Sequence, residues 1–437
     1  MLQPAAFPIL RHLAEDLRET KDVTLWRGVL DAHKRALYRK LAARCARTNA
    51  MALTLKALNI CLARHHLQTR AVALLSRPVG LVVDPSNMCR LACPGCVHSE
   101  SNVAAARFDW ANGTLREKVF HLLLERYGAY SIGMNLYNYG EPLLNRSTPK
   151  LIRQAKRYLM HTALSTSLSV QHFDAEAYVA SGLDCMILSI DGITQQVYQS
   201  FRRNGNLELV LENLRRLVDV RRRLRSRTPV LVWNFLGFEH NIHEIGAARR
   251  MARRLGVDLF QLVRPFDVSW DDPAIRPAEV QRRLWRFHWL PLPKYNPRLE
   301  RDADAGPIEA AFERPWIGEA DSGNADSGHT CHWLYKNTVV DAAGRVLPCC
   351  SSPAPGTNLV FGRADANSAD LYNTRLYQAA RSFFANGMES SGDAPHCTRC
   401  EWNQDKVNIG SEEIWRYFHS ADATFFDARS LEMLAGW

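Results

Sequence analysis

Cys89, Cys93 and Cys96 form a Cys-x3-Cys-x2-Cys array within the segment VVDPSNMCRLACPGCVHS. The array directly follows a short apolar run, which places the three thiols on the loop after a strand. Such a loop can wrap three thiolates around one corner of a cubane iron-sulfur cluster and leave one of the four irons open to a small molecule. Zinc is the alternative, and it would need a fourth ligand such as His98.

A second group of cysteines lies towards the C-terminus and comprises Cys331, Cys349, Cys350, Cys397 and Cys400. Alternating polar and apolar residues in YKNTVVDAAGRVLPCC predict a hairpin that brings Cys331 close to Cys349. Four thiolates without an open position suit a second [4Fe-4S] cluster that passes electrons or shapes a pocket, and we assign them to Cys331, Cys349, Cys397 and Cys400. Tetrahedral zinc is again the alternative. Cys350 could replace Cys349 or pack beside it.

Eleven cysteines in a chain without an export signal indicate metal ligation rather than disulfide bonds. Cys45, Cys61 and Cys185 stand singly in apolar patterns, so we expect them to be small buried hydrophobic residues. The first ten residues contain no Lys or Arg, and charged residues soon interrupt any signal-peptide core. No stretch approaches the roughly 18 to 20 apolar residues of a membrane helix. We therefore predict a cytoplasmic protein.

The net charge of +10 is concentrated at the N-terminus. Residues 1–80 contain 14 Lys and Arg against 5 Asp and Glu, so this segment alone carries +9. It could bind an anionic partner such as an acidic peptide, a membrane surface or RNA, or it could simply be a solvated helical face.

The pattern of apolar residues predicts an α/β fold. Residues 8–76 show helical spacing, whereas from residue 78 onwards short apolar runs alternate with amphipathic stretches, which is typical of parallel βα units. The predicted strands cover residues 81–83, 132–136, 162–167, 186–190, 230–235 and 259–263, and the predicted helices cover 111–127, 148–159, 173–180, 207–224 and 243–255. Six such units favour a partial (β/α)6 TIM-like barrel over a flat sheet.

The predicted domains are a helical basic N-terminal domain (1–76), the partial barrel (77–265), a Pro- and Trp-rich linker (266–330), a small cysteine-rich domain (331–405) and a tail (406–437). We expect the linker to fold partly over the mouth of the barrel. The cysteine-rich domain is short and punctuated by glycine, so we expect its fold to depend on bound metal.

The three-cysteine loop resembles the signature of the radical S-adenosylmethionine (SAM) superfamily, and the resemblance extends over residues 78–265. It implies that the open iron chelates the amino and carboxylate groups of SAM. Reductive cleavage of SAM would then give a 5′-deoxyadenosyl radical that takes a hydrogen atom from the substrate, with electrons from a donor such as flavodoxin or ferredoxin. The sequence departs from the family at Gly95, where a bulky residue usually precedes the last cysteine. The adenine contact made there must come from elsewhere.

The segment YNYGEPLLN after the second predicted strand is similar to the Gly-Gly-Glu-Pro motif of the family, which binds the amino group of SAM. Its position fits, because barrel active sites are built at the C-terminal ends of strands. The resemblance assigns four residues to SAM binding, namely Tyr139, Gly140, Glu141 and Pro142. Tyr139 stands where the family has its first glycine, and without the resemblance the segment reads as an ordinary turn.

Later strands end in further segments that resemble the family. LSTSLS could supply Ser165 or Ser167 to the ribose of SAM. LSIDG, followed by YQSFRRNGNLELVLENL, implies that Ser189 and Arg202 face the ribose and the carboxylate, and Arg offers a carboxylate two parallel donors. Taken alone, Arg202 also reads as a surface charge.

The late cysteines resemble the twitch domain, a shortened SPASM domain, because no cysteine follows Cys400. The resemblance implies one auxiliary [4Fe-4S] cluster and an oxidation or bond formation. Relatives act on ribosomal peptides and on sugar or aminocyclitol intermediates, and the N-terminus does not read as a winged-helix leader-binding domain. We therefore expect a radical SAM oxidoreductase that acts on a sugar- or cyclitol-type small molecule. The alternatives are a ribosomal-peptide maturase, an RNA-modifying enzyme, and a non-enzymatic zinc or iron-sulfur protein with an anionic partner. The sequence assigns no catalytic acid or base.

Overall fold

The computed structural model describes residues 71–99, 113–263, 272–278, 288–291, 333–350, 360–367 and 370–386, together with single positions between 55 and 70 and residues 265, 331 and 397. The N-terminal segment up to residue 54, with Cys45, lies outside the described residues. So do Cys61, Cys400, most of the predicted linker and the predicted tail.

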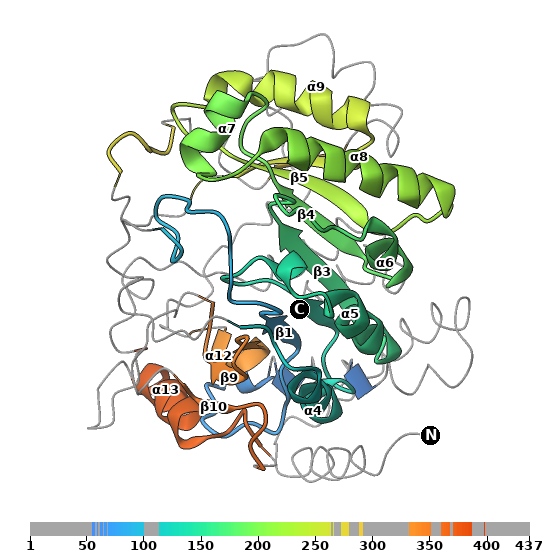
Figure 1. The fold of residues 1–437 in the computed structure, drawn as a ribbon. Helices are drawn as coiled ribbons and strands as arrows, with labels where there is room; N and C mark the ends of the chain where they lie inside the picture. Colours follow the sequence, from blue (N-terminus) through green and yellow to red (C-terminus); the bar gives the residue numbers. More distant parts are fainter. Residues whose placement is uncertain are drawn as a thin grey trace.

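A single sheet forms the centre of the described structure (Figure 1), with its strands in the order β10-β9-β8-β1-β2-β3-β4-β5-β6-β7. The strands are β1 (Gly80–Val83), β2 (Gly133–Asn135), β3 (His161–Thr166), β4 (Cys185–Ser189), β5 (Val230–Leu236), β6 (Leu259–Val263), β7 (His288–Pro291), β8 (Asn337–Val340), β9 (Arg345–Leu347) and β10 (Gly362–Arg363). Strands β1 to β6 are parallel and lie side by side in chain order. This is the arrangement expected of successive βα units.

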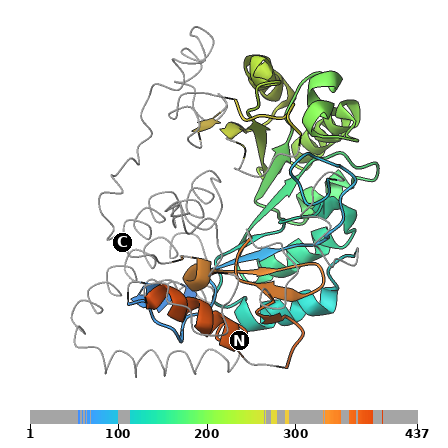
Figure 2. The same cartoon turned by 90° about the vertical axis from the view of Figure 1, so that its left-hand side faces the viewer.

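Helices connect these strands and cover one face of the sheet, as the two views in Figures 1 and 2 show. They are α4 (Glu117–Tyr127), α5 (Thr148–Arg157), α6 (Ala175–Ala180), α7 (Gln195–Phe201), α8 (Leu207–Arg223) and α9 (Ile245–Leu255), with the short 3-10 turns η2 (Pro142–Leu144) and η3 (Ile242–Glu244). In α8, Val210, Leu214 and Leu217 recur at helical spacing and are fully buried. Asn206 caps this helix by accepting a hydrogen bond from Leu209 N at 3.1 Å.

The main hydrophobic core lies between these helices and the outer face of the sheet. The opposite, inner face carries a smaller apolar cluster that includes Ala163, Cys185 and Val232. Cys185 is fully buried there, which confirms it as a small hydrophobic residue. Side chains alternate between the two faces of a strand, so residues two positions further along the same strands also face the inside.

The C-terminal part of the chain continues the same sheet. Strand β8 pairs in parallel with β1, from Gly80 opposite Asn337 to Val83 opposite Val340, and β9 folds back on β8 as the predicted hairpin. The short helix α12 (Trp333–Lys336) precedes β8, and α13 (Arg375–Ala385) packs against α12. The barrel and the cysteine-rich segment therefore share one continuous set of strands.

A buried arginine joins the N-terminal and C-terminal segments. Arg381 is fully buried and donates hydrogen bonds to the carbonyl oxygens of Leu334 at 3.0 Å and Val72 at 3.2 Å. Its guanidinium also lies over three tyrosine rings, those of Tyr335, Tyr372 and Tyr377. Cation-π contacts and carbonyl acceptors together compensate the burial of this charge.

The predicted partial barrel and its six strands are confirmed, and each strand end differs from the prediction by at most one residue. The sequence analysis missed α7, which has seven residues, and β7, which pairs antiparallel with β6 inside the predicted linker. Both elements are too short to give a clear periodic pattern. Among the helices of the described residues, none has the length and apolar character needed to cross a membrane.

Candidate functional site

The three early cysteines lie on the loop that follows β1, as predicted. Two backbone hydrogen bonds shape the loop, from Cys96 N to Cys93 O at 3.0 Å and from Ser99 N to Cys96 O at 2.9 Å. Gly95 has a φ of 71°. This left-handed conformation is costly for residues with a side chain, which explains why the chain has glycine here.

Apolar residues from three separate segments surround the cysteine loop. Cys93 is buried in a cluster with Leu91, Phe201, Phe238 and Ile275, and Cys89 and Cys96 pack against it. Ile275 belongs to residues 272–278 of the predicted linker, whose backbone bonds to the end of β5. This part of the linker therefore lies against the cysteine loop, where Ile275 packs in the same cluster as Cys93.

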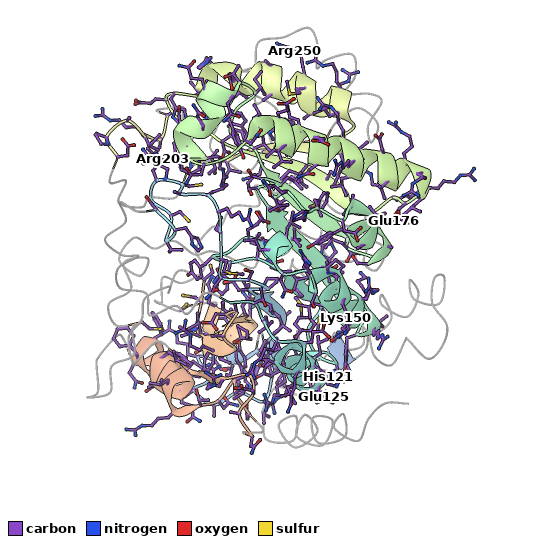
Figure 3. The ribbon with its side chains drawn as sticks, in the orientation of Figure 1. His121, Glu125, Lys150, Glu176, Arg203 and Arg250 are labelled. Atoms are coloured by element: carbon purple, nitrogen blue, oxygen red, sulfur yellow. The ribbon has the colours of Figure 1, made fainter. Side chains whose placement is uncertain are left out.

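The second residue after α7, Arg203, anchors the same loop. Arg203 O accepts a hydrogen bond from Ala92 N at 3.1 Å, and the Arg203 side chain forms an ion pair with Asp272. Figure 3 labels Arg203 beside the loop. The cysteine loop is thus held both by the segment after α7 and by the covering segment 272–278.

Arg202 lies directly beside the thiols. Its Nε donates to Asp191 Oδ2 at 2.6 Å, and its Nη1 lies 3.8 Å from Cys93 Sγ. Asp191 is fully buried, and its other oxygen accepts from Leu236 N at 2.7 Å. Burial lowers the pKa of Arg202, but the neighbouring Asp191 and Cys93 more than offset this and raise the pKa, so the guanidinium stays charged. The site therefore holds a fixed positive charge next to Cys93.

The donor set fits an iron-sulfur cluster. The three thiols share one loop and one buried cluster, and Cys93 and Cys96 each contribute to raising the pKa of Cys89, after the larger effect of burial. Burial raises the pKa of Cys89 to about 12 and that of Cys93 to about 11. Without metal these thiols are protonated at neutral pH, so they need cationic iron to become ligands.

The test of the zinc alternative is whether side chains converge on one metal ion, and His98 is the histidine nearest in sequence to the three cysteines. Its Nε2 lies 2.8 Å from the carbonyl oxygen of Tyr139. A carbonyl oxygen only accepts, so Nε2 carries the proton and donates, and Nδ1 is the ring nitrogen that keeps a lone pair. Burial lowers the pKa of His98, which keeps the ring neutral. Within the described part of the chain, no three His, Cys, Asp or Glu side chains converge as ligands of a single metal ion do.

The YGEP turn is fixed to the start of the cysteine loop. Asp84, at the end of β1, accepts hydrogen bonds from Tyr139 N at 3.1 and 3.2 Å, and Glu141 N donates to Met88 O at 2.7 Å. Burial raises the pKa of Asp84 to about 7, against the opposing effect of the N–H groups of Tyr139 and Gly140. The turn and the cysteine loop therefore form one hydrogen-bonded unit.

Glu141 is buried and fully engaged within the protein. One carboxylate oxygen accepts from Thr166 Oγ1 at 2.6 Å, and the other accepts from Ser167 N at 2.9 Å and Ser167 Oγ at 2.7 Å. The carboxylate therefore holds the end of β3 against the turn. The adjoining backbone, including Pro142 at the start of η2, remains the part of this motif that we propose for SAM binding.

Gly140 can be tested directly, because a Cβ atom at this position would lie 1.8 Å from Ser86 O and 2.9 Å from Asn87 Cα. We expect Gly140→Ala to push the turn off the cysteine loop, to destabilise the protein by about 1 to 3 kcal/mol and to abolish the spectral change on adding SAM. Urea denaturation and electron paramagnetic resonance measure the two effects. Gly362→Ala is the matched control, since its nearest contact would be an ordinary 3.5 Å. Equal behaviour of the two variants would contradict the packing described here.

The predicted serines separate into two groups. Ser165 on β3 and Ser189 on β4 lie side by side on the inner face, with their Oγ atoms 3.4 Å apart. Ser167 instead bonds to Glu141 and is buried. The strand register places Asn234 opposite Ser189 and Asn135 opposite Ala163, so both asparagines also face the inside. Asn135, Ser165, Ser189 and Asn234 are half-buried and form a polar band at the C-terminal ends of β2 to β5.

The auxiliary cysteines surround the tyrosine cluster under Arg381. Burial is the main cause that raises the pKa of Tyr377, and the nearby thiols of Cys349 and Cys397 raise it further. In the same way, the thiol of Cys331 adds to the effect of burial on the pKa of Tyr335. Cys397 is buried in the main core, and Cys331 packs against it. The structure therefore brings Cys331, Cys349 and Cys397 to one region, while Cys400 lies outside the described residues.

Cys350 has different surroundings from Cys349. It packs on a second apolar cluster of the inner face, which Val82, Val339 and Leu347 form. Its carbonyl oxygen accepts a hydrogen bond from the Tyr139 hydroxyl. We therefore expect Cys349→Ser to lower the iron content from about eight to about four per chain, and Cys350→Ser to leave it unchanged. Iron and sulfide analysis after anaerobic reconstitution measures both. The reverse pattern would make Cys350 the ligand.

Asp84, Asp191, Asn135 and Asn234 are site residues that the sequence analysis missed. Asp191 is fully buried, and its place directly after the apolar strand in LSIDG is the sequence signal that could have found it. The asparagines could have been found from their place at strand ends of a predicted barrel.

Comparison with known families supports the interpretation of both cysteine groups. Residues 83–245 match the model of the radical SAM superfamily, and residues 331–401 match the model of the SPASM iron-sulfur cluster-binding domain. The first region contains Cys89, Cys93 and Cys96, and the second begins at Cys331. A radical SAM domain binds a [4Fe-4S] cluster and SAM, and a SPASM domain binds auxiliary iron-sulfur clusters.

Individual relatives are distant. The chain is 24% identical over 285 residues to PqqA peptide cyclase of Gluconobacter oxydans, which covers 64% of this chain and 72% of the relative. It is 20% identical over 231 residues to a probable GTP 3′,8-cyclase of Pyrococcus horikoshii, and this match covers 49% of the chain and 72% of the relative. Streptococcus suis SuiB bound to S-adenosylmethionine has a similar fold, with a TM-score of 0.51, 16% identity, and coverage of 80% of this chain and 77% of SuiB.

Proposed function

We propose that this chain, a radical SAM enzyme by its match over residues 83–245 with a SPASM domain at residues 331–401, modifies a peptide by removing a hydrogen atom and forming a new bond or an oxidised group. The main observation in favour of this catalysis is that Cys89, Cys93 and Cys96 share one apolar cluster. The strands of the same barrel end in polar residues on the inner face, among them Ser165 and Ser189. Active sites of parallel barrels are built at this end of the strands.

The peptide substrate rests on the relative with the longest match given above. PqqA peptide cyclase aligns with 64% of the chain, whereas the probable GTP 3′,8-cyclase aligns with 49%. The peptide alternative therefore has more support than the sugar- or cyclitol-type substrate that the sequence favoured. The family match also supports an enzyme over the alternative of a non-enzymatic zinc or iron-sulfur protein.

Three groups of residues around the first cluster would have separate roles in binding and catalysis. Cys89, Cys93 and Cys96 would hold the first cluster and leave one iron for SAM. When bound, the cluster and SAM would supply a 5′-deoxyadenosyl radical for hydrogen abstraction. Arg202 would offset the negative charge of the thiolates. Ser165 and Ser189 would donate hydrogen bonds to the polar groups of a bound ligand.

The C-terminal cysteines would hold the auxiliary cluster. Cys331, Cys349, Cys397 and Cys400 offer four thiolates and no open position, which suits electron transfer. Because hydrogen abstraction leaves an unpaired electron on the substrate, formation of a closed-shell product requires one electron and one proton to leave. The cluster held by these cysteines would take up the electron, and the proton would pass to solvent. A small electron-transfer protein of the flavodoxin or ferredoxin type would supply the reducing electron to the first cluster.

The experiment combines the anaerobically reconstituted full chain with SAM, a chemical reductant and short peptides encoded by open reading frames next to its gene. We expect one peptide to stimulate the formation of 5′-deoxyadenosine and to lose two hydrogen atoms in mass. Mass spectrometry of the peptide measures this. Stimulation by GTP or by a sugar phosphate, with no change in any peptide, would support the small-molecule alternative and contradict the proposal.

A further inference from the structure

Tyr139 makes hydrogen bonds to three separate parts of the molecule. Its backbone N–H donates to Asp84 at the end of β1, and its carbonyl oxygen accepts from His98 Nε2 at 2.8 Å, two residues after the last cysteine of the first set. Its side-chain hydroxyl donates to the carbonyl oxygen of Cys350. One residue thus contacts three places: the end of β1, the cysteine loop that follows it (called the SAM-site loop below), and Cys350 in the auxiliary set.

The ring of Tyr139 lies between the two cysteine sets. Burial raises the pKa of its phenol well above the usual value, and Cys350, Cys349 and Asp84 add to this in that order. A buried hydroxyl needs a hydrogen-bond acceptor, and within the described residues the structure gives it the backbone of Cys350. The family motif that YGEP resembles has glycine in this place, and glycine has no side chain to make such a bond.

We propose that Tyr139 is a positioning residue that fixes the segment of the auxiliary cysteines relative to the SAM-site loop. The proposal rests on the assignment of the two cysteine sets in the proposed function. The hydroxyl anchors the backbone at Cys350, directly after the ligand Cys349, while the backbone of Tyr139 anchors the turn to the SAM-site loop. The orientation of the auxiliary ligand therefore depends on a side chain that belongs to the SAM-binding domain.

Tyr139→Phe removes the hydroxyl and keeps the ring, so it deletes this one bond with little change in volume. The test uses the full chain in a Cys93→Ala background, in which the auxiliary cluster alone remains and no SAM is cleaved. Two properties are measured: the electron paramagnetic resonance spectrum of the reduced cluster, and the rate at which a chelator removes its iron. Neither depends on turnover.

We expect Tyr139→Phe to shift and broaden the spectrum and to speed iron release roughly fivefold to tenfold, which corresponds to one net hydrogen bond. Tyr139→Gly should have a larger effect in the same direction. Cys350→Ser keeps the accepting carbonyl, and Tyr158→Phe alters a tyrosine at the end of α5; both should match the background protein. A parent-like spectrum and release rate in Tyr139→Phe would overturn the proposal. A Cys93→Ala chain without iron would instead contradict the cysteine assignment, and the proposal with it.

Discussion

Cys93→Ala should abolish SAM cleavage while leaving the auxiliary cluster in place. Cys93 is the most deeply buried of the three early cysteines and lies beside Arg202. Two remaining thiolates cannot hold a cubane whose fourth iron must stay open. We expect formation of 5′-deoxyadenosine to fall at least about a thousandfold, which is the scale on which removal of an essential catalytic group acts, and iron to fall from about eight to about four per chain.

Cys185→Ala is the matched control for this variant. Cys185 is also buried and lies on β4, but it belongs to the apolar inner-face cluster rather than the cysteine loop. We expect it to retain full iron content and SAM cleavage, with a loss of stability that reflects one deleted sulfur atom. If the Cys93→Ala chain still produced 5′-deoxyadenosine, the assignment of the SAM site would be wrong.

Arg202→Met should destabilise the protein by about 3 to 5 kcal/mol, because it leaves the carboxylate of Asp191 buried without its partner. The Arg202 side chain is 14% exposed and that of Asp191 is 0% exposed, so water cannot replace the lost ion pair. The variant also removes the positive charge next to Cys93, so we expect the first cluster to lose iron more readily. Urea denaturation and iron analysis measure the two effects.

Arg223→Met is the appropriate control, since Arg223 pairs with Glu176 at side-chain exposures of 60% and 56%. An exposed pair of this kind contributes about 0 to 1 kcal/mol. The double variant Arg202→Met with Asp191→Asn removes the uncompensated charge and should recover part of the lost stability but not the iron affinity. Similar stabilities for Arg202→Met and Arg223→Met would show that the buried Arg202–Asp191 pair contributes no more to the free energy of unfolding than an exposed pair.

The sequence was sufficient for the barrel strands and the cysteine positions. Parallel strands that are buried on both faces form short continuous apolar runs, and thiol spacing within one loop is a local property. The partners of Arg202 and Glu141 were not predictable in the same way. Arg202 contacts Cys93, 109 positions earlier, and Glu141 bonds to Thr166 at the end of β3 and to Ser167 directly after it.

The pairing of β8 with β1 was also missed, for a related reason. The predicted hairpin at β8 and β9 is local and was confirmed, but local pattern does not reveal which strand a hairpin edge joins. Gly80 pairs with Asn337 across most of the barrel sequence. Such pairing depends on the free edge of the folded barrel, which exists only in three dimensions.

The same pairing has a consequence for how the protein is made. Roughly 250 residues separate the two partner strands in the chain, so during synthesis one side of β1 has unmatched peptide groups until β8, in the last quarter of the chain, has emerged from the ribosome. Open strand edges promote association between nascent chains. Genes shortened before codon 337 should therefore yield insoluble material, even though every residue of the SAM-binding domain would be present.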